Sequence, residues 1–518
     1  MDPVNLALLA ILVTIIAYLV LHARKVNHYW KERNIPYVEP HLFIGNSAPI
    51  LFRTLTNGET LKSICDRFPN EPIIGYYDFM KPTILIKDAE IIEQILIKDF
   101  VHFVDRGFPV DEEKNPLDSN LSVMTGKRWK AVRNRLSPIF TTGKLRLMYD
   151  AIADCGNELV TQMEGDQEID MREILGRFAM DVIGSCAFGI DAGNLTNPDN
   201  EFRTMGKKAF EFGFSQFAKF IMLTNFPNIA KKIGISFNRP DVLKYFTGII
   251  NNTIKHRREN NYQRNDFLQL LMQVQDKGYV EVLTKDPADE YLNIETSSFS
   301  TEKFELSNDQ IAGQAFIFLT AGFEATTLTM MYTLYELSKN PDIQEKVRKE
   351  VQREVKNAGS LNYDAVKGME YLEQCVKETM RKYPPAPMLF RVCTKSYTLP
   401  NGLTIEPGQP LQVSVYSLHY NPSYYPEPEK YKPERFDPDQ TIPSCAYIPF
   451  GNGPRICIAM RFAMLQMKYC LAKLLLTYKF QVSPKTREPL RYSVKSFFTA
   501  PADPILFNVS KLEVEENI

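Results

Sequence analysis

The chain has 518 residues, of which 44% are hydrophobic and 24% are charged, and its formal net charge is -1. These values exclude a disordered chain, a collagen-like repeat and a strongly basic nucleic-acid-binding protein, so no nucleic-acid partner is expected. None of the 8 cysteines forms a CxxC pair. This pattern argues against a disulfide framework or a zinc ribbon and indicates a reducing compartment.

The N-terminal segment predicts a membrane anchor. Residues 3–21 carry no charged side chain and are long enough to cross a hydrocarbon core as a helix. The flank that follows is basic, so the positive-inside rule leaves the rest of the chain in the cytosol. A cleaved signal peptide fits poorly, because a basic N-terminal region and an Ala-x-Ala site are missing. We predict an anchor over 3–21, a basic flank and proline connector over 22–46, and a catalytic domain over 47–518.

The first half of the domain combines strands, a basic stretch and a polar loop. Residues 73–87 are rich in β-branched and aromatic side chains, which predicts strands. Residues 126–146 hold seven basic residues and no acid, which stands out in a nearly neutral chain although a solvated face is the usual explanation. Residues 275–307 are polar and aperiodic, which predicts a surface loop.

Helices dominate the second half. They are expected at 307–339, where a capping box precedes an unusually long apolar pattern, and at 361–381 and 458–478. Residues 419–449 contain seven prolines in 31 positions, which predicts an irregular segment. We therefore predict a mostly α fold with small β-sheets, arranged as a single catalytic domain behind an N-terminal transmembrane anchor.

One cysteine lies where a merely structural thiol is not expected. Cys457 follows a glycine-rich loop and directly precedes the last predicted helix. Helix N-terminal amides and loop N–H groups lower the pKa of such a sulfur, and Arg455 offers charge to an anionic group nearby. A soft thiolate in an apolar setting is a good ligand for haem iron. The alternative, a buried inert thiol, is what we expect for cysteines such as Cys65 and Cys470.

The same loop resembles the haem-binding loop of the cytochrome P-450 monooxygenases, Phe-x-x-Gly-x-Arg-x-Cys-x-Gly. The chain matches this pattern at Phe450, Gly453, Arg455 and Cys457, and it has Ala459 where the pattern ends in Gly. The resemblance implies that Cys457 ligates the iron of haem b and that Phe450, Gly453 and Arg455 belong to the cofactor site.

Two further motifs of the family occur in its order. Glu378-Thr379-Met380-Arg381 resembles the Glu-x-x-Arg motif, whose spacing places both charges on one helix face. The family implies that Arg435 joins this pair and holds the proline-rich segment under the haem. Trp129 and Arg133 resemble a Trp-x-x-x-Arg helix whose ends meet a haem propionate. The alternatives are a surface ion pair for the first motif and a core tryptophan beside a solvated arginine for the second.

The long helix carries a departure from the family. Residues 321–326 resemble the pattern Ala/Gly-Gly-x-Asp/Glu-Thr-Thr/Ser, which implies catalytic roles in proton delivery for Glu324 and Thr326. Ala325 replaces the first threonine, and Thr326 lies about 100° further around the helix, so it cannot simply take over. Either Glu324 and ordered water carry the protons, or oxygen activation is leakier, or the reaction needs no such delivery.

A substrate pocket is expected against this helix. Phe318, Ala321, Gly322 and Ala325 recur at spacings of three and four, so they share one helix face, which the resemblance turns toward the iron. The resemblance adds loop residues to the same pocket, from 107–122 and 210–220, with Leu389 from 387–390 and Phe498 from 497–499.

The resemblance also implies partners and location. It predicts a haem-thiolate monooxygenase in the endoplasmic reticulum membrane, facing the cytosol, that receives electrons from NADPH through NADPH–cytochrome P-450 reductase, with cytochrome b5 as a second candidate donor. The basic stretch 126–146 is a candidate docking surface for an acidic partner. Residues 102–107 and 138–145 look most like the insect microsomal branch that oxidises plant toxins and insecticides, so the expected substrates are apolar xenobiotics.

Three other functions are compatible with these motifs. The first is a selective hydroxylase of an endogenous hormone or lipid, and the second is a haem-thiolate isomerase or dehydratase that needs no reductase, which Ala325 would permit. The third is a non-catalytic haem or ligand binder. Dependence on reductase separates the isomerase from the oxygenases, and turnover across a diverse panel separates a broad oxygenase from a selective one.

Overall fold

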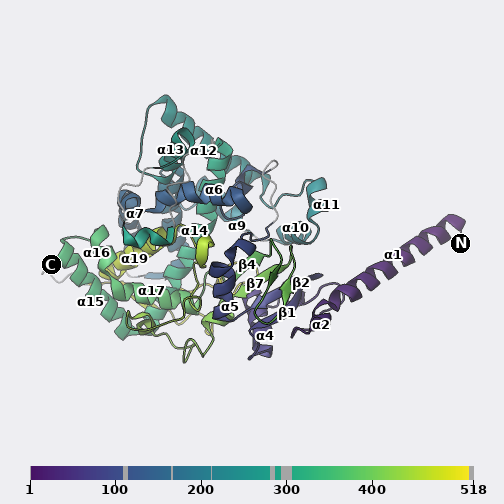
Figure 1. The fold of residues 1–518 in the computed structure, drawn as a ribbon. Helices are drawn as coiled ribbons and strands as arrows, with labels where there is room; N and C mark the ends of the chain where they lie inside the picture. Colours follow the sequence, from purple (N-terminus) through teal and green to yellow (C-terminus); the bar gives the residue numbers. More distant parts are fainter. Residues whose placement is uncertain are drawn as a thin grey trace.

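The structure is a computed structural model. It describes residues 2–108, 115–164, 167–211, 213–280, 286–292 and 306–512. A helical body with small β-sheets follows one long helix, α1 (Pro3–Asn27), that projects from it (Figure 1). The predicted class, mostly α with small sheets, is confirmed. Helix α1 runs beyond residue 21, where the anchor was expected to end, because the basic flank continues the helix up to the cap at His28.

The remaining helices make up most of the body. They are α2 (Tyr29–Glu32), α3 (Ala48–Leu51), α4 (Asn57–Arg67), α5 (Ala89–Glu93), α6 (Gly126–Leu136), α7 (Thr142–Thr161), α8 (Met171–Ile183), α9 (Glu201–Phe210), α10 (Phe214–Asn225), α11 (Pro227–Lys232), α12 (Pro240–Glu259), α13 (Phe267–Lys277), α14 (Asn308–Lys339), α15 (Pro341–Ala358), α16 (Tyr363–Gly368), α17 (Glu370–Lys382), α18 (Val415–His419) and α19 (Met460–Thr477).

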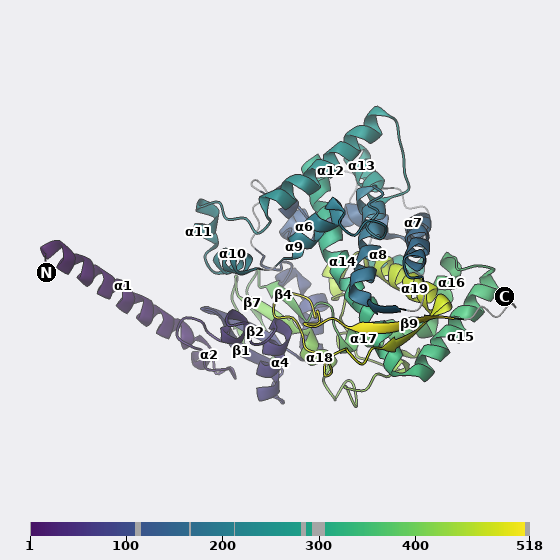
Figure 2. The same cartoon turned by 180° about the vertical axis from the view of Figure 1, so that it is seen from behind.

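Three small sheets complete the described fold. The largest has the order β1-β2-β7-β4 and lies on the side from which α1 projects in both views (Figures 1 and 2). The second has the order β3-β9-β8, and the third pairs β5 with β6. The strands are β1 (Ile73–Asp78), β2 (Lys81–Ile86), β3 (Gln167–Asp170), β4 (Met388–Val392), β5 (Tyr397–Thr398), β6 (Thr404–Ile405), β7 (Pro410–Ser414), β8 (Tyr478–Val482) and β9 (Leu506–Lys511).

The strands predicted at 73–87 form an antiparallel hairpin. Ile73 of β1 faces Ile86 of β2, and Asp78 faces Lys81 across the turn. The pairing of β2 with β7 is parallel, whereas that of β4 with β7 is antiparallel. This order brings β4, from the second half of the chain, next to the cavity described below.

Helix α14 runs through the body, as the sequence predicts. Ser307 and Gln310 exchange the two hydrogen bonds of a capping box at its N-terminus, and Asn340 ends it. Two helices, α1 and α14, are long and apolar enough to span a membrane, but the apolar stretch of α14 is mostly buried inside the protein whereas that of α1 is not buried at all. Helix α14 is therefore a core helix.

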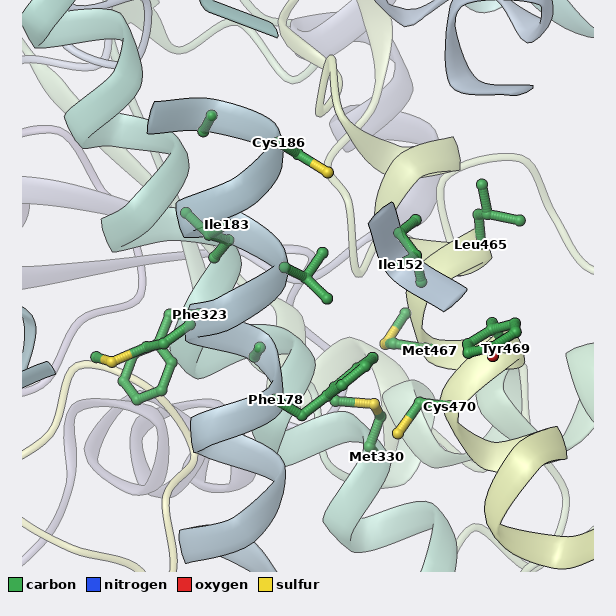
Figure 3. Close-up of a cluster of buried hydrophobic side chains, with 14 of the residues drawn as sticks. Ile152, Phe178, Ile183, Cys186, Phe323, Met330, Leu465, Met467, Tyr469 and Cys470 are labelled. Atoms are coloured by element: carbon green, nitrogen blue, oxygen red, sulfur yellow. The ribbon is translucent and has the colours of Figure 1, made fainter. Parts of the chain in front are cut away.

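The main core forms where α8 and α19 pack on α14. Figure 3 shows Phe178 of α8, Met330 of α14 and Cys470 of α19 pointing toward one another. All three side chains are fully buried. Cys470 therefore has the structural role expected for it.

Two predicted elements need correction. The helix expected over 361–381 is two helices, α16 and α17, because Met369 between them leaves the helical region with φ -76° and ψ 83°. The loop expected over 275–307 contains a short 3-10 helix, Pro287–Leu292, whose Leu292 joins the main core. Residues 281–285 and 293–305 of that loop lie outside the described residues. The proline-rich segment 419–449 is irregular as predicted, apart from the 3-10 turn Pro433–Phe436.

Candidate haem-thiolate site

The loop before α19 holds Cys457 by backbone contacts. The Cys457 N–H donates to the Phe450 carbonyl oxygen at 2.9 Å, which closes the loop on itself. Ala459, where the family pattern has Gly, is the N-cap of α19 with φ -95°. Any residue adopts that conformation, so alanine is tolerated without backbone strain.

Gly453 is required by two features of the same loop. Its φ is +68°, and a Cβ atom there would lie 1.9 Å from the Leu96 carbonyl oxygen. Gly451 has a similar φ of +74° but no atom closer than 4.0 Å to such a Cβ. Substitution of Gly451 would therefore introduce backbone strain alone, whereas substitution of Gly453 would introduce the same strain and a steric clash.

We expect Gly453→Ala to destabilise the fold by more than Gly451→Ala. The left-handed conformation costs about 1 kcal/mol in both variants, and only Gly453→Ala must also displace the Leu96 backbone. Chemical denaturation of the two variants checks this order. Equal losses would mean that the contact with Leu96 relaxes at no cost.

The thiol environment differs from the sequence-based expectation. Burial raises the pKa of the Cys457 thiol, while the Ala459 N–H, Arg133 and Arg106 act in the opposite direction. A net lowering was predicted, and the prediction was wrong because it counted the amides and the charge but not the burial. The groups that favour the thiolate are nevertheless in place around the sulfur.

Three buried arginines, Arg133, Arg391 and Arg455, and the half-buried Arg106 lie in this region. Burial lowers the pKa of Arg133 to about 10, of Arg391 to about 9 and of Arg455 to about 8, and it also lowers the pKa of Arg106. Within the described part of the chain, their ion pairing is limited to a 3.9 Å contact of Arg455 with Asp105. The region therefore carries an excess of buried positive charge.

The arginines differ in how their hydrogen bonds are used. Arg455 donates to three carbonyl oxygens of the preceding loop, those of Val104 (3.0 Å), Leu121 (3.1 Å) and Met124 (2.6 Å), and its guanidinium stacks 4.1 Å from the Trp129 ring centre. The Arg133 guanidinium makes no hydrogen bond or ion pair with any described residue, although the Arg133 carbonyl oxygen accepts from the Ser137 hydroxyl.

Arg391 and Arg106 were not singled out from the sequence as site residues. The Nε of Arg391 is buried and has no acceptor, and its Nη1 donates to the Phe390 carbonyl oxygen at 2.7 Å. Arg106 donates to the Ser122 hydroxyl at 2.8 Å. A lone arginine on a strand or a loop has no local signal that would have distinguished it from a surface residue.

The Glu-x-x-Arg motif forms a buried network. The Glu378 carboxylate accepts two hydrogen bonds from Arg381, at 2.7 and 2.8 Å, and both side chains are fully buried. Arg435 approaches Glu378 at 3.3 Å from the proline-rich segment. Arg381 also donates to the carbonyl oxygens of His419 and Pro428, so the structure brings together the three residues that the sequence grouped and fastens the irregular segment to α17.

His419 in this network gives a pH prediction. Burial, together with the nearby charge of Arg381, lowers the pKa of His419 to about 3, and its Nε2 accepts the Ile448 N–H at 3.1 Å. The unfolded chain binds this proton near pH 6.5. Since the unfolded state binds more protons below that pH, stability should fall there by up to about 1.4 kcal/mol per pH unit.

Urea unfolding at about pH 7 and pH 5.5, compared between the wild type and His419→Gln, isolates this contribution. The variant should show the weaker pH dependence of the two, with both curves reporting the remaining titratable groups equally. Equal losses of unfolding free energy at the lower pH in the two proteins would contradict a neutral, buried His419.

On α14, Glu324 is paired across the fold. Its carboxylate forms an ion pair with Arg172 on the first turn of α8, and the Glu324 side chain is nearly buried. The Thr326 hydroxyl donates within its own helix to the Gly322 carbonyl oxygen at 2.5 Å. Ala325 is half-buried and has no polar side-chain atom. Thus Glu324 is the residue of this motif whose polar group lies away from the helix backbone.

A cavity of about 940 Å³ lies beside α14. Glu324, Thr320, Phe323 and Thr327 line it from this helix. Met388 and Phe390 of β4 contribute from the sheet, as do parts of 107–122 and 210–220. Residues 109–114 and 212 of those predicted lining segments lie outside the described residues.

Some of the individually predicted pocket residues line the cavity and others do not. Phe498 lines the cavity, and Leu389, whose neighbours in β4 do so, packs against the cluster around the large sheet. Phe318 stacks on Phe140 and Phe267, with ring centres 5.3 and 4.0 Å away. On the same helix face Ala321 is exposed and Gly322 and Ala325 are half-buried. This face is therefore accessible, but it is adjacent to the cavity wall rather than part of it.

The basic stretch 126–146 is only partly a surface. Lys127, Arg128 and Lys130 are exposed on α6, whereas Arg133 and Arg135 are buried. Lys144 is buried as well, and Arg146 pairs with Asp364 at 2.5 Å. The charge exposed to a partner is therefore smaller than the sequence count indicates.

The arrangement of the cysteine loop, the buried Glu-Arg pair and the long central helix agrees with comparison to known proteins. The family model described as Cytochrome P450 matches residues 36–509. The chain therefore belongs to the cytochrome P450 family and is a monooxygenase. Membership implies a haem cofactor, a redox partner and a small-molecule substrate.

Similar curated proteins come from flies. The chain is 36% identical to "Probable cytochrome P450 6a14" of Drosophila melanogaster, over 94% of this chain and 96% of that protein. It is 35% identical to "Cytochrome P450 6a9" of the same species, covering 98% and 99% of the two chains. "Cytochrome P450 6d3" of Musca domestica is also 35% identical, with 98% of each chain covered. The predicted likeness to insect relatives is thus confirmed.

Proposed function

We propose that the protein is a membrane-bound haem-thiolate monooxygenase that oxidises apolar xenobiotics with electrons from NADPH. The observation that carries the proposal is the placement of Cys457, in a closed loop before α19, beside Arg133 and Arg106, for which the described residues supply no acidic partner. The cavity beside α14 supplies space for a substrate of moderate size.

The residues present fit haem. A soft thiolate suits its iron, and the buried guanidinium groups of Arg133 and Arg391, which are short of acceptors, suit its two carboxylates. We infer that Cys457 is the metal ligand and that Arg133, Arg391 and Trp129 hold the propionates. Arg455, Phe450 and Gly453 would shape the loop, while Glu378, Arg381 and Arg435 hold the irregular segment.

When bound, a thiolate-ligated haem supplies the cleavage of the O–O bond and insertion of one oxygen atom into a substrate C–H or C=C bond. The chain's own part is orientation and proton transfer. Glu324 is the residue we assign to proton transfer, because its carboxylate lines the cavity, where Arg172 holds it. Thr326 would support the helix backbone rather than move protons, since its hydroxyl is bonded to Gly322.

The aromatic lining favours apolar substrates. Phe210, Phe323, Phe390 and Phe498 all line the cavity, and such surfaces bind molecules by burying apolar area. Together with the similarity to insect proteins, this lining supports a role in oxidising foreign compounds such as plant toxins or insecticides. A selective hydroxylase of an endogenous lipid or hormone remains the second candidate, because the same lining suits those substrates.

Electron supply is proposed to come from NADPH–cytochrome P-450 reductase, with cytochrome b5 as an additional donor. The exposed charges of Lys127, Arg128 and Lys130 on α6 provide a basic surface for an acidic partner. Arg133 follows on the same helix and points to the buried site. One helix thus connects the proposed docking surface to the cofactor site.

We propose an endoplasmic reticulum location with the domain on the cytosolic face. Helix α1 is long and apolar enough to span a bilayer, and its flank is basic. Exposed apolar side chains, including Phe214 at 81% exposure, occur on α10 and α11, on the side of the body from which α1 projects (Figures 1 and 2). Residues 3–21 would be the anchor, 22–46 the connector and 47–518 the catalytic domain.

The test is NADPH consumption by the purified full-length protein in lipid vesicles with reductase and a substrate panel, counting product against hydrogen peroxide. Products from many apolar compounds, formed only with reductase, would support the proposal. Turnover confined to one lipid or hormone would favour the selective hydroxylase. No NADPH use, with a normal thiolate-type carbon monoxide spectrum, would favour a reductase-independent isomerase.

Ala325 gives a prediction within the same assay. We expect Ala325→Thr to raise the ratio of product to peroxide, by up to about tenfold if one well-placed hydroxyl contributes a full hydrogen bond. Thr326→Ala is the matched control and should leave the ratio unchanged, because that hydroxyl is bonded to the helix backbone. A ratio that responds to Thr326→Ala but not to Ala325→Thr would contradict the assignment.

A further inference from the structure

Two buried amide oxygens in the cavity lining have no hydrogen-bond donor among the residues that the structure describes. They are Oδ1 of Asn115 and Oε1 of Gln216. Asn115 is the residue at which the described chain resumes after residue 108, and Gln216 lies on α10. Both side chains are at least nine-tenths buried. Neither oxygen was indicated by any motif in the sequence.

The orientation of the Gln216 amide is determined by its partner. Its Nε2 donates to the Phe237 carbonyl oxygen at 3.2 Å. A carbonyl oxygen only accepts hydrogen bonds, so the atom facing it must be the NH₂ group. Oε1 therefore faces away from Phe237 and is left as an acceptor.

Asn115 is attached to the same linker. Its Nδ2 contacts the Ser236 hydroxyl at 3.1 Å, next to the residue that binds Gln216. The linker between α11 and α12 thus contacts both amides. The Phe237 carbonyl oxygen fixes the orientation of Gln216, whereas the Ser236 hydroxyl can donate to or accept from Asn115. We call these two residues, with Ser236 and Phe237, the amide pair site.

Most other polar groups of the cavity wall are already engaged. Asp118 accepts a hydrogen bond from Asn238 at 3.2 Å. Glu324 pairs with Arg172, and Glu173 pairs with Arg203. The aromatic residues Phe108, Phe210, Phe323, Phe390 and Phe498 cover much of the remaining wall. An unpaired acceptor therefore stands out in a cavity wall whose other named polar groups are paired.

An unpaired buried acceptor costs about 1–3 kcal/mol, which a ligand with a suitably placed donor recovers. A hydrocarbon or an ether offers no donor, and an anion would bring negative charge to carbonyl oxygens. A hydroxyl or a neutral N–H group fits the chemistry of the site.

We propose that the amide pair site anchors substrates that carry a hydroxyl or neutral N–H group on an otherwise apolar, aromatic-sized frame. The proposal rests on the proposed function and names the substrate class within it. Asn115 and Gln216 are the specificity-determining residues, because they accept the hydrogen bond of the donor group.

The test compares para-phenylphenol with its methyl ether, which has the same frame but no donor. Dissociation constants are measured by isothermal titration calorimetry with the full-length, haem-loaded protein. We expect the phenol to bind about tenfold more tightly, as one recovered hydrogen bond predicts. Equal affinity of the wild-type protein for the two probes, or tighter binding of the ether, would by itself overturn the proposal.

Variants locate the effect. Gln216→Leu removes one acceptor at similar size and should reduce the preference for the phenol at least threefold. Asn238→Leu is the matched control, since it also lies in the cavity wall but its amide is used by Asp118. The control should keep the wild-type preference. A preference that survives Gln216→Leu, or is lost equally in Asn238→Leu, would overturn the assignment of the site.

Failure of this proposal is distinguishable from failure of the proposed function. Calorimetry needs neither reductase nor turnover, so a protein that oxidises apolar compounds yet binds phenol and ether equally would contradict only the amide pair site. A protein that prefers the phenol but consumes no NADPH would contradict only the monooxygenase assignment.

Discussion

Cys457→Ser is expected to abolish the thiolate-type carbon monoxide spectrum and to reduce product formation to background. The serine hydroxyl is a harder, weaker ligand than a thiolate and does not supply the same electron density. The change removes one sulfur atom from a loop whose backbone hydrogen bond to Phe450 is unaffected. The variant should therefore fold, and its loss of activity should come from the changed iron ligand and not from unfolding.

Cys445→Ser is the matched control. Cys445 is buried, whereas Cys457 is half-buried, and it lies in the irregular segment 12 positions before Cys457 in the sequence, where its sulfur accepts from the Asn452 side chain at 3.3 Å. Serine can accept the same hydrogen bond, so the control should keep both the spectrum and the activity. A thiolate-type carbon monoxide spectrum that persists in Cys457→Ser, or disappears in Cys445→Ser, would contradict the ligand assignment.

Arg381→Leu is expected to cause the largest loss of stability among single substitutions in the network under α17. It leaves the fully buried Glu378 carboxylate without its two strongest donors, and breaking one side of such a pair costs about 3–5 kcal/mol. It also frees the carbonyl oxygens of His419 and Pro428 from their donor. Chemical denaturation measures the loss, and haem retention on a desalting column reports whether the irregular segment stays in place.

A surface pair provides the comparison. Arg146 and Asp364 lie 2.5 Å apart, but their side chains are 52% and 61% exposed. Arg146→Leu should change stability by no more than about 1 kcal/mol. The double variant Glu378→Leu/Arg381→Leu should be more stable than Arg381→Leu, because the fully buried Glu378 carboxylate is removed together with its partner, while Arg435 keeps its hydrogen bond to the Glu427 carbonyl oxygen. If Arg146→Leu costs as much as Arg381→Leu, burial is not the source of the effect.

Features encoded by neighbouring residues could be predicted from the sequence. The capping box at Ser307 predicted the start of α14, and the strands within 73–87 followed from their β-branched and aromatic residues, whereas their pairing as a hairpin was not predicted. The contact of Glu378 with Arg381 followed from a spacing of three on one helix. The break at Met369 was missed although Gly368, a residue typical of helix ends, directly precedes it, because an isolated glycine inside a helical pattern does not by itself end a helix.

Features that join distant segments could not be predicted. Glu324 and Arg172 are 152 positions apart, and only the packing of α8 against α14 brings them together. Arg391 and Arg106 reach the Cys457 region from a strand and a loop, and the resemblance of residues 102–107 to the insect branch did not assign Arg106 to the site. The helix face chosen for the pocket was inferred from spacing alone, which gives the residues that share a face but not the direction in which that face points.

The contact between residues 115–118 and the linker 236–238 has a consequence for how quickly bound molecules leave. The hydrogen bonds of Asn115 with Ser236 and of Asn238 with Asp118 join segments about 120 positions apart, and each bond contributes only about 1 kcal/mol. Separating the two segments is therefore easy compared with disturbing the core. A molecule with one donor for Asn115 and a second donor for Gln216 joins residues 115–118 to α10, whose Gln216 is bonded to Phe237 of the same linker, and so lengthens its own residence in the cavity.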